Sequence, residues 1–329
     1  MQGIKILGTS SYVPETTVLN DDFAKIIETS DEWISTRTGI KKRHFAMGMP
    51  TWQMGYNAAV KAIENSGISK EDIDLIICTT VTPDTLTPST ACIIQRELGA
   101  YGCMAMDINC ACSGFVYAVD VAQKYLMSGD VKKVLVVSAE ILTKYVDYKD
   151  RSSCILFGDG AAAAVIESAA APYSSFLGAD GRGADYLKTS SLNNQRHPFF
   201  KIKNIDYEKP SDNDGLLFQD GKEVYKFAVG MMPHAINKVV EKAGLSYDDI
   251  DMIIPHQANI RIIQTAASKL GISMEKFYLN ISDYGNTSSA SIPIALNEII
   301  ERGVIKRGDT IVLVGFGAGL TYGAVCIKY

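Results

Sequence analysis

An internal repeat constrains the fold of this chain more than any other feature of its sequence. Residues 62–77 read AIENSGISKEDIDLII, and residues 240–254 read VEKAGLSYDDIDMII, with the shared glycine recurring 177 positions later. Each copy ends a helical pattern at glycine, restarts with a Ser-x-x-Asp turn, and enters an apolar run typical of a strand buried on both faces. A second pair of similar segments, 129–137 and 308–314, is offset by 179 positions. Two such pairs in the same order indicate a duplicated α/β unit.

The repeat divides the chain into two α/β halves, which we place at residues 1–170 and 171–329. Short apolar runs alternate with longer helical patterns, and parallel strands need such crossover connections. We therefore expect mostly parallel sheets covered by helices. Residues 190–214 break the pattern, because they are rich in Asn, Asp, Lys and Pro and show no periodicity. We expect them to form a surface excursion or flap.

Composition excludes several classes of protein. The 329 residues are 47% hydrophobic and 21% charged, which is typical of a globular chain with a large core and not of a disordered or fibrous one. No apolar run is long enough to predict a membrane span. The net charge of −5 provides no overall field that attracts nucleic acid. The absence of an export signal and the odd number of cysteines, seven, predict a cytoplasmic protein.

Cys112 is the strongest candidate for a chemically special residue. It follows an apolar run that ends near Ile108 and precedes a helical pattern that stops at Gly129, so we place it at the N-terminal end of a buried helix. The helix dipole and the unpaired N–H groups there favour a thiolate, which a cysteine nucleophile requires. Two alternatives stay open from the residues alone: a small buried cysteine, and a metal or redox pair with Cys110.

Two polar positions in the second half complement this cysteine. His256 comes directly after the apolar run 252–255, at the carboxyl end of a predicted strand, where α/β sheets present ligands. Asn286 lies 174 residues after Cys112, in the turn that the repeat makes equivalent. The alternative for Asn286 and its neighbours is a simple helix cap.

A glycine-rich segment at residues 315–319 reads GFGAG. It lacks the lysine of a phosphate-binding loop, and a strand pattern follows it where such a loop would lead into a helix, so we do not expect a dinucleotide site there. Glycines of this kind allow backbone N–H groups to point into a cavity, as an oxyanion hole needs.

Four motifs in this order carry a resemblance to a known family. They are Ala-Cys-Ser-Gly-Phe at 111–115, Pro-His-Gln-Ala-Asn at 255–259, Gly-Asn-Thr-Ser at 285–288 and Gly-Phe-Gly-Ala-Gly-Leu-Thr at 315–321. Together they resemble the β-ketoacyl-acyl-carrier-protein synthase III family, the initiating condensing enzymes of bacterial fatty acid synthesis. The resemblance runs end to end. It implies a homodimer with the thiolase-like α/β fold, in which two duplicated halves form a five-layered αβαβα architecture.

The resemblance also implies the reaction, a decarboxylative Claisen condensation of a short acyl-CoA with malonyl-acyl-carrier protein. Cys112 would accept the acyl group, and the backbone N–H groups of Cys112 and Ala318 would hold the oxyanion. His256 and Asn286 would donate hydrogen bonds to the malonyl thioester, which requires a neutral His256. Neither a metal nor a cofactor is implied, because acyl-CoA is a substrate.

Further residues acquire expected roles only through this resemblance. Those expected to bind CoA are Thr29, Trp33, Arg37, Arg151 and Asn259. Those expected to receive the acidic carrier protein are Lys226, Arg261 and Lys269. Thr87, at a position that the resemblance places in the acyl pocket of the partner subunit, and Phe316 are expected to shape the acyl site. The small threonine predicts tolerance of longer or branched primers.

A departure at Cys110 and three alternative functions accompany the resemblance. Cys110 stands where the family more often has alanine, which places a second thiol near the nucleophile. The nearest alternative is a specialised relative that serves a secondary-metabolite pathway. A degradative thiolase fits less well, because it needs a second cysteine in the glycine-rich loop and Cys326 lies in a strand pattern instead. A scaffold without catalytic activity is the alternative outside enzymology, and the intact Cys112, His256 and Asn286 argue against it.

Overall fold

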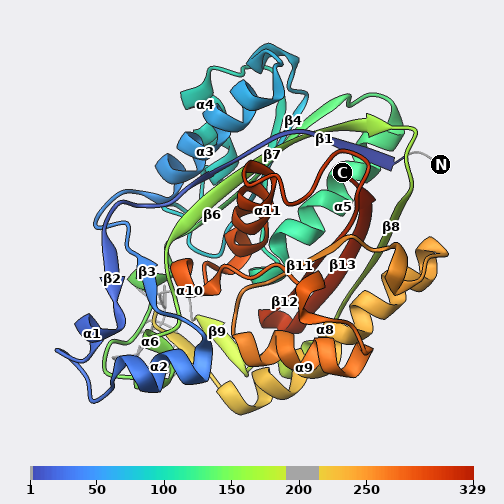
Figure 1. Ribbon diagram of the computed structural model, residues 1–329. Helices are drawn as coiled ribbons and strands as arrows, with labels where there is room; N and C mark the ends of the chain where they lie inside the picture. The colour runs from blue at the N-terminus through green and yellow to red at the C-terminus, as the bar shows by residue number, and fades with distance from the viewer. Residues whose placement is uncertain (1–2, 190–214) are drawn as a thin grey trace, which may run out of the picture.

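The computed structural model describes residues 3–189 and 215–329, and the predicted excursion at 190–214 lies outside these described residues. The chain forms two large β-sheets with helices between them and on both outer faces (Figure 1). The strands of the first large sheet lie between residues 3 and 169, and those of the second between 173 and 328. The division at residue 170 stays a prediction of where the two halves meet.

The two sheets share one strand order, as the sequence repeat predicts. The first sheet runs β1-β7-β6-β4-β5 and consists of β1 (Gly3–Tyr12), β4 (Leu75–Thr79), β5 (Met104–Ile108), β6 (Lys133–Glu140) and β7 (Gly160–Ala169). The second runs β8-β13-β12-β11 and consists of β8 (Tyr173–Ala179), β11 (Met252–Pro255), β12 (Thr310–Gly317) and β13 (Thr321–Lys328). A single parallel bridge between Ile253 and Phe277 takes the place of a fifth strand.

The expectation of mostly parallel sheets is wrong. β6, β4 and β5 are parallel neighbours, but β7 pairs antiparallel with both β6 and β1. The second sheet repeats this pattern, since β11 and β12 are parallel while β13 is antiparallel to β12 and to β8. Long helices connect only the parallel strands. The link from β12 to β13 is a single turn at Ala318–Leu320, which suffices only for an antiparallel return.

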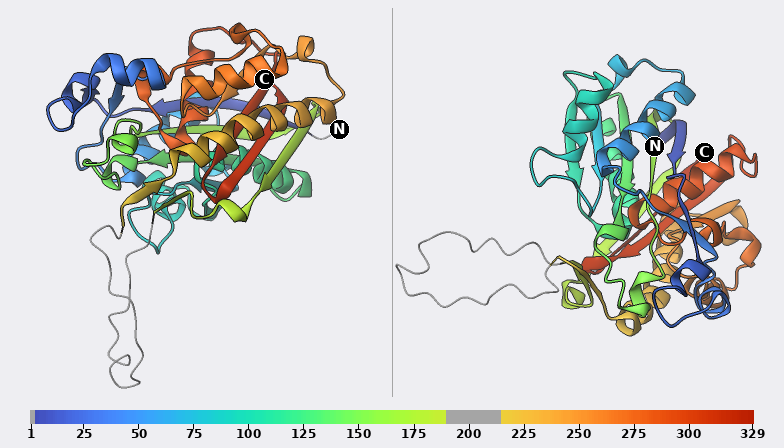
Figure 2. Two further views of the ribbon diagram at one scale, coloured as in Figure 1. Left: turned by 90° about the horizontal axis from the view of Figure 1, so that it is seen from below. Right: turned by 90° about the vertical axis from the view of Figure 1, so that its left-hand side faces the viewer.

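Helices complete five layers. One outer layer is α3 (Thr51–Ser66) and α4 (Thr90–Leu98), which pack on the first sheet. The middle layer is α5 (Gly114–Ser128) and α11 (Ser291–Glu301), whose apolar side chains lie in one core between the sheets. The other outer layer is α8 (Gly221–Ala243) and α9 (Ile260–Leu270), which lie side by side over the second sheet (Figure 2).

The local signals of the repeat are confirmed in both halves. α3 ends at Gly67 and α8 ends at Gly244, and both glycines adopt the left-handed conformation that closes a helix. A reciprocal cap follows in each half, formed by Ser69 with Asp72 and by Ser246 with Asp249. Each cap leads directly into a buried strand, β4 or β11.

Short elements gather at one end of the sheets and form a small core of their own, in which Phe23, Ile34, Ile155 and Ile281 pack together. They are β2 (Thr17–Leu19), α1 (Asn20–Phe23), α2 (Asp31–Thr38), β3 (Lys42–His44), α6 (Arg151–Cys154), β9 (Leu187–Thr189), β10 (Leu217–Gln219) and α10 (Ile281–Tyr284). None of the helices among the described residues has the length and apolar character needed to cross a membrane.

Candidate functional site

Cys112 lies in a single 3-10 turn, Ala111–Ser113, between β5 and α5. The preceding residue, Ala111, has a φ of +48°, a conformation that side chains with a Cβ rarely adopt. The other half repeats the feature, since Ser288 at the start of the turn before α11 has a φ of +51°. Two strained turns therefore meet at the inner layer, and such strain is typical of functional sites.

Two hollows have Cys112 in their walls. The larger is a cavity of about 530 Å³, lined mainly by apolar side chains that include Val81, Leu142 and Leu217. The smaller is about 90 Å³ and is shared by Cys112, His256, Asn286, Asn259 and Phe316, among others. The structure thus brings the three predicted catalytic side chains into one small space, although they come from three separate segments of the chain.

Burial has the largest effect on the pKa of the Cys112 thiol. The side chain is buried, and this burial raises its pKa to about 12, with the carboxyl of Glu140 adding to the rise. A helix N-terminus stabilises an anion by at most about 2 kcal/mol. Burial therefore opposes the thiolate that we expect the helix end to favour, and that expectation stays a prediction. The Sγ–H group donates to Ser288 Oγ at 3.4 Å.

His256 is held as a neutral ring. It follows β11, is 1% exposed, and burial lowers its pKa to about 3. Nδ1 lies 2.6 Å from Ser291 Oγ, and that same oxygen accepts a weak bond from the backbone N–H of Gln257 at 3.4 Å. The Ser291 hydroxyl donates to Nδ1 in the tautomer that carries the ring proton on Nε2, and this is the tautomer that the expected donor role of His256 requires. Phe316 packs edge-on against the imidazole, with 5.2 Å between the two ring centres, and so restricts the plane of the imidazole.

Asn286 is clamped at both its backbone and its side chain. Its N–H donates to Leu156 O, and its C=O accepts from Gly158 N. Its Oδ1 accepts from the backbone N–H of Ser288 at 2.9 Å. Since a backbone N–H can only donate, this bond fixes which end of the amide is oxygen, and the Nδ2 group is the end left to act as a donor.

The glycine-rich segment lies directly against the cysteine. A Cβ on Gly317 would fall 2.6 Å from the backbone nitrogen of Cys112, so only glycine allows this approach. Ala318 lines the larger cavity together with Cys112. Both residues belong to short 3-10 turns, whose first N–H groups have no acceptor within the turn. The two backbone positions named for the oxyanion hole are thus next to each other.

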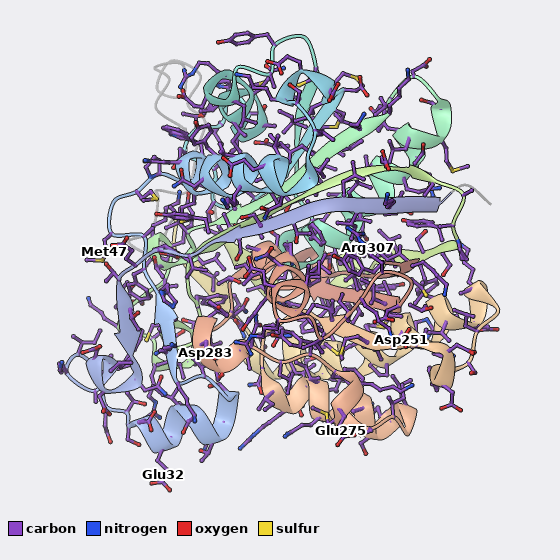
Figure 3. All side chains as sticks on the ribbon, turned by 45° about the horizontal axis from the view of Figure 1, so that its top comes forward. Glu32, Met47, Asp251, Glu275, Asp283 and Arg307 are labelled. Atoms are coloured by element: carbon purple, nitrogen blue, oxygen red, sulfur yellow. The ribbon has the colours of Figure 1, made fainter. Side chains whose placement is uncertain are left out.

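The predicted CoA-binding residues gather on α2, α6 and the start of α9. Two guanidinium groups lie over the ring of Trp33, with the Cζ atoms of Arg37 and Arg151 at 4.7 Å and 4.6 Å from the ring centre. Figure 3 shows Glu32 on the same helix pointing out to solvent. Thr29 Oγ1 is buried without a hydrogen-bond partner. Asn259 caps α9 and lines the smaller hollow beside His256.

The three predicted docking cations lie on neighbouring helices. Lys226 is on α8 and forms an exposed ion pair with Glu223 at 3.7 Å. Lys269 and Arg261 are on α9, and the first donates to Val229 O of α8 at 3.0 Å. Arg261 instead donates to Thr36 O of α2 at 3.0 Å. This arginine therefore connects α9 to α2, the helix that carries two of the predicted CoA-binding residues.

The two residues predicted for the acyl pocket lie in different places. Phe316 lines the hollow at Cys112 and supports His256. Thr87 lies on the exposed loop before α4 and is absent from the walls of both hollows. A role for Thr87 in an acyl pocket therefore depends on a second subunit.

Sequence reasoning did not predict three residues of this site. Ser291 orients His256, while Ser288 and Glu140 lie behind the sulfur of Cys112. Glu140 could have been noticed as a lone acid at the end of the apolar run that forms β6, since buried acids are rare. All seven cysteines, Cys110 included, are free thiols. The described residues contain no group of three or more His, Cys, Asp or Glu side chains that could hold a metal ion.

Comparisons with known proteins agree along the whole chain. Family models described as 3-Oxoacyl-[acyl-carrier-protein (ACP)] synthase III, and as its C-terminal part, match residues 106–185 and 240–329. The β-ketoacyl-[acyl-carrier-protein] synthase III of Clostridium tetani is 50% identical over 99% of this chain and 98% of its own.

Solved structures show the same relationship. 3-Oxoacyl-[acyl-carrier-protein] synthase III from Aquifex aeolicus superposes with a TM-score of 0.91 at 44% identity, over 99% of this chain and 100% of its own. The priming β-ketosynthase of the R1128 polyketide pathway reaches 0.90 at 35% identity, over 99% and 96%. The predicted thiolase-like fold is confirmed.

Proposed function

Since this chain belongs to the β-ketoacyl-[acyl-carrier-protein] synthase III family, we propose that its acyltransferase chemistry is carried by Cys112, His256 and Asn286. The chain is a condensing enzyme of fatty acid synthesis, as its relatives are. The observation that carries the assignment of residues is the hollow whose wall contains all three side chains.

In the first step, the sulfur of Cys112 attacks the thioester carbon of a short acyl-CoA. The developing oxyanion lies against the N–H groups of Cys112 and Ala318, at the two 3-10 turns that Gly317 allows to approach each other. CoA leaves, and the acyl group stays on the cysteine as a thioester. The larger, mostly apolar cavity provides room for that acyl group and for the chain that delivers it.

In the second step, malonyl-acyl-carrier protein enters and loses CO2. The electrons of the broken bond move into the thioester, whose carbonyl oxygen becomes an enolate oxygen. Nε2–H of His256 and Nδ2–H of Asn286 donate to that oxygen, and both are aimed by bonds on their other sides. The carbanion then attacks the acyl-cysteine and yields a β-ketoacyl-carrier protein.

The substrates would approach along the short elements that surround the small core at the end of the sheets. We assign the adenosine end of CoA to Trp33 with Arg37 and Arg151, since an aromatic face and two guanidinium forks suit a nucleotide with phosphates. Thr29 and Asn259 would contact the rest of the molecule. Because acyl-CoA is consumed in the reaction, no bound cofactor is required.

The carrier protein would dock on the outer face of α8 and α9. The three cations involved are Lys226, Arg261 and Lys269, and they occupy neighbouring helices. A local positive face steers an acidic partner even though the whole chain has a net charge of −5.

We propose a homodimer formed at β5. This strand is the edge of the first sheet, and its residues are exposed or half-buried, whereas β4 beside it is fully buried. An unpaired edge is a template for another strand, and two copies related by a two-fold axis can pair through the same edge. The exposed loop with Leu86 and Thr87 would then reach the partner, where a small Thr87 leaves space for longer or branched primers. We place the enzyme in the cytoplasm, which suits its seven free thiols.

A second candidate function is priming of a specialised pathway, because the R1128 polyketide ketosynthase is similar along the whole chain. The deciding experiment supplies acetyl-CoA or isobutyryl-CoA as primer and compares malonyl-acyl-carrier protein with other acceptors. We expect β-ketoacyl-carrier protein as the main product, with isobutyryl-CoA used at least as well as acetyl-CoA. Preference for another acceptor would favour the specialised pathway, and strict acetyl use would overturn the prediction for Thr87.

A further inference from the structure

A buried carboxyl group lies behind the reactive sulfur. Glu140 ends β6 in the first half, and its side chain is completely buried. The ion pairs formed by the described residues do not include it. Burying a carboxylate without a cation costs free energy, so the presence of a glutamate at this position needs a physical explanation.

Neutral donors hold this carboxyl group. Oε2 accepts from the backbone N–H of Val81 and from Thr82 Oγ1, both at 3.0 Å. Oε1 accepts from Ser289 Oγ at 2.6 Å and from Ser288 Oγ at 3.2 Å. These bonds suit an ionised carboxylate, because it can only accept. Burial nevertheless raises the pKa of Glu140, so the site also favours taking up a proton.

Ser288 connects this carboxylate to the nucleophile. The Sγ–H group of Cys112 donates to Ser288 Oγ at 3.4 Å, and Ser288 Oγ–H donates to Glu140 Oε1 at 3.2 Å. Both bonds run in the same direction, from the thiol toward the carboxylate. Ser288 is held in place by its own backbone N–H, which donates to Asn286 Oδ1. Two proton jumps along this line would move one proton from sulfur to carboxylate and leave the serine unchanged.

We propose that Ser288 and Glu140 form a proton relay that takes the proton of Cys112 during acylation and returns it during condensation. The inference rests on the proposed function, since it concerns the proton of the same nucleophile. It adds two residues from opposite halves of the chain to the machinery of the reaction.

The acylation step balances as follows. The bond from Cys112 sulfur to the acyl carbon forms, and the bond from that carbon to the CoA sulfur breaks with its electron pair leaving on CoA. The thiol proton passes to Ser288 Oγ while the serine proton passes to Glu140. The CoA thiolate takes its proton from solvent. The pocket never holds a thiolate and a carboxylate together, which removes the repulsion by which Glu140 raises the pKa of Cys112.

The condensation step returns the proton. Loss of CO2 supplies the electron pair of the new carbon–carbon bond, and the cysteine leaves the acyl group as a thiolate. Glu140 then gives its proton back through Ser288, which restores the thiol and the carboxylate. Over the whole cycle one solvent proton is consumed, by CoA, as the overall reaction requires.

The other candidate base for the thiol proton of Cys112 is His256, and the surroundings of its ring make it unsuitable. Its Nδ1 lies 2.6 Å from Ser291 Oγ, and the proposed decarboxylation step needs the proton on its Nε2 as a hydrogen-bond donor. Its burial opposes the charged ring that a base would become. The relay therefore leaves His256 neutral throughout the cycle.

The kinetic test uses two neighbouring serines. Ser288→Ala removes the link to the sulfur. Ser289→Ala removes a bond to the same Glu140 oxygen, at a hydroxyl that donates to Glu140 at 2.6 Å and is not bonded to Cys112. In single-turnover acylation by acetyl-CoA, we expect about a 100-fold loss for Ser288→Ala, the usual contribution of general base catalysis, and only a few-fold loss for Ser289→Ala. Equal rates in the two variants would overturn the relay.

The spectroscopic test follows the proton itself. The infrared difference spectrum of acyl-enzyme minus free enzyme should gain the carbonyl band of a protonated buried carboxylic acid, and Glu140→Gln should lack it. A wild-type acyl-enzyme without this band would overturn the relay, even if Glu140→Gln folds poorly. Mass spectrometry of the same sample separates the two proposals: absence of an acyl-cysteine contradicts the proposed function, whereas an acyl-cysteine without the band contradicts only the relay.

Discussion

The chemistry of single residues at this site depends on which partners they have already engaged. In the proposed mechanism His256 donates from Nε2 while Nδ1 bonds to Ser291, and Asn286 donates from Nδ2 because the Ser288 N–H occupies Oδ1. Neither side chain has to reorganise when an enolate oxygen forms between them. Such prior orientation is the usual source of large electrostatic contributions to catalysis.

Replacing the histidine should separate the two steps. His256→Ala is expected to form the acyl-enzyme at close to the wild-type rate, because the ring takes no proton from the cysteine. Decarboxylation of malonyl-acyl-carrier protein should fall about 100- to 1,000-fold, the usual cost of one lost oxyanion donor. Stopped-flow release of CoA and of CO2 measures the two steps. Normal decarboxylation in the variant would contradict the role assigned to His256.

Burial of His256 should also appear in the pH dependence of stability. The folded pKa of about 3 lies below the usual value of 6.5, so between these values the unfolded chain binds more protons. The contribution of a neutral His256 is complete above about pH 6.5 and is lost as the pH falls, by up to about 1.4 kcal/mol per pH unit.

Urea denaturation between pH 4 and pH 7 measures this effect against His256→Gln, which does not titrate. The free energy of unfolding of the wild type, relative to the variant, should rise with pH over this range. A difference that stays constant would show that the ring is not buried in its neutral form.

At the scale of elements, the site depends on how closely two turns approach. The turn at Ala111–Ser113 and the glycine segment before β13 meet at Cys112, and no side chain fits between them. The first turn comes from one half of the chain and the second from the other. The proposed oxyanion hole therefore depends on packing between the halves.

Gly317→Ala tests this contact. Its Cβ would lie 2.6 Å from the Cys112 nitrogen, so we expect a loss of about 1–3 kcal/mol in stability, the usual cost of overpacking, together with a loss of acylation. Gly230→Ala is the matched control, because this glycine lies inside α8 with no atom within 4 Å of the new Cβ. The control should be neutral or stabilised by up to about 1 kcal/mol. Similar behaviour of the two variants in urea denaturation would contradict the close approach.

At the scale of the whole molecule, local signals were predictable and long-range ones were not. The glycine stops at 67 and 244 and the caps after them depend on neighbouring residues, so the sequence predicts them directly. The antiparallel returns of β7 and β13 depend on which strands become neighbours, and the prediction of mostly parallel sheets failed there. Likewise, the raised pKa of Cys112 follows from burial by the complete fold.

The partners of the catalytic residues illustrate the same limit. Cys112, His256 and Asn286 each belong to a short motif that can be recognised alone. Ser288 and Glu140 are 148 residues apart, and their side chains form a hydrogen bond only when β6 and the turn before α11 are in contact. No local pattern in the chain links them.

The assembly of the whole molecule is predicted to depend on the open edge of β5. Met104→Lys places a charge at an edge position that is 43% exposed, and we expect the dimer dissociation constant to rise at least about 10-fold, which is 1.4 kcal/mol. Val304→Lys, at a residue 53% exposed before β12, is the control and should leave the dimer intact. Sedimentation of both variants measures the effect, and two unchanged dimers would place the interface elsewhere.

The most direct test of the account is the identity of the acylated residue. The enzyme is incubated with acyl-CoA, analysed by intact mass and peptide mapping, and then chased with malonyl-acyl-carrier protein. The account predicts one acyl group per chain, located on Cys112, absent in Cys112→Ser, and transferred to the carrier protein as a β-ketoacyl product during the chase. An acyl group on Cys110 or another residue, or one on Cys112 that the chase does not remove, would contradict it.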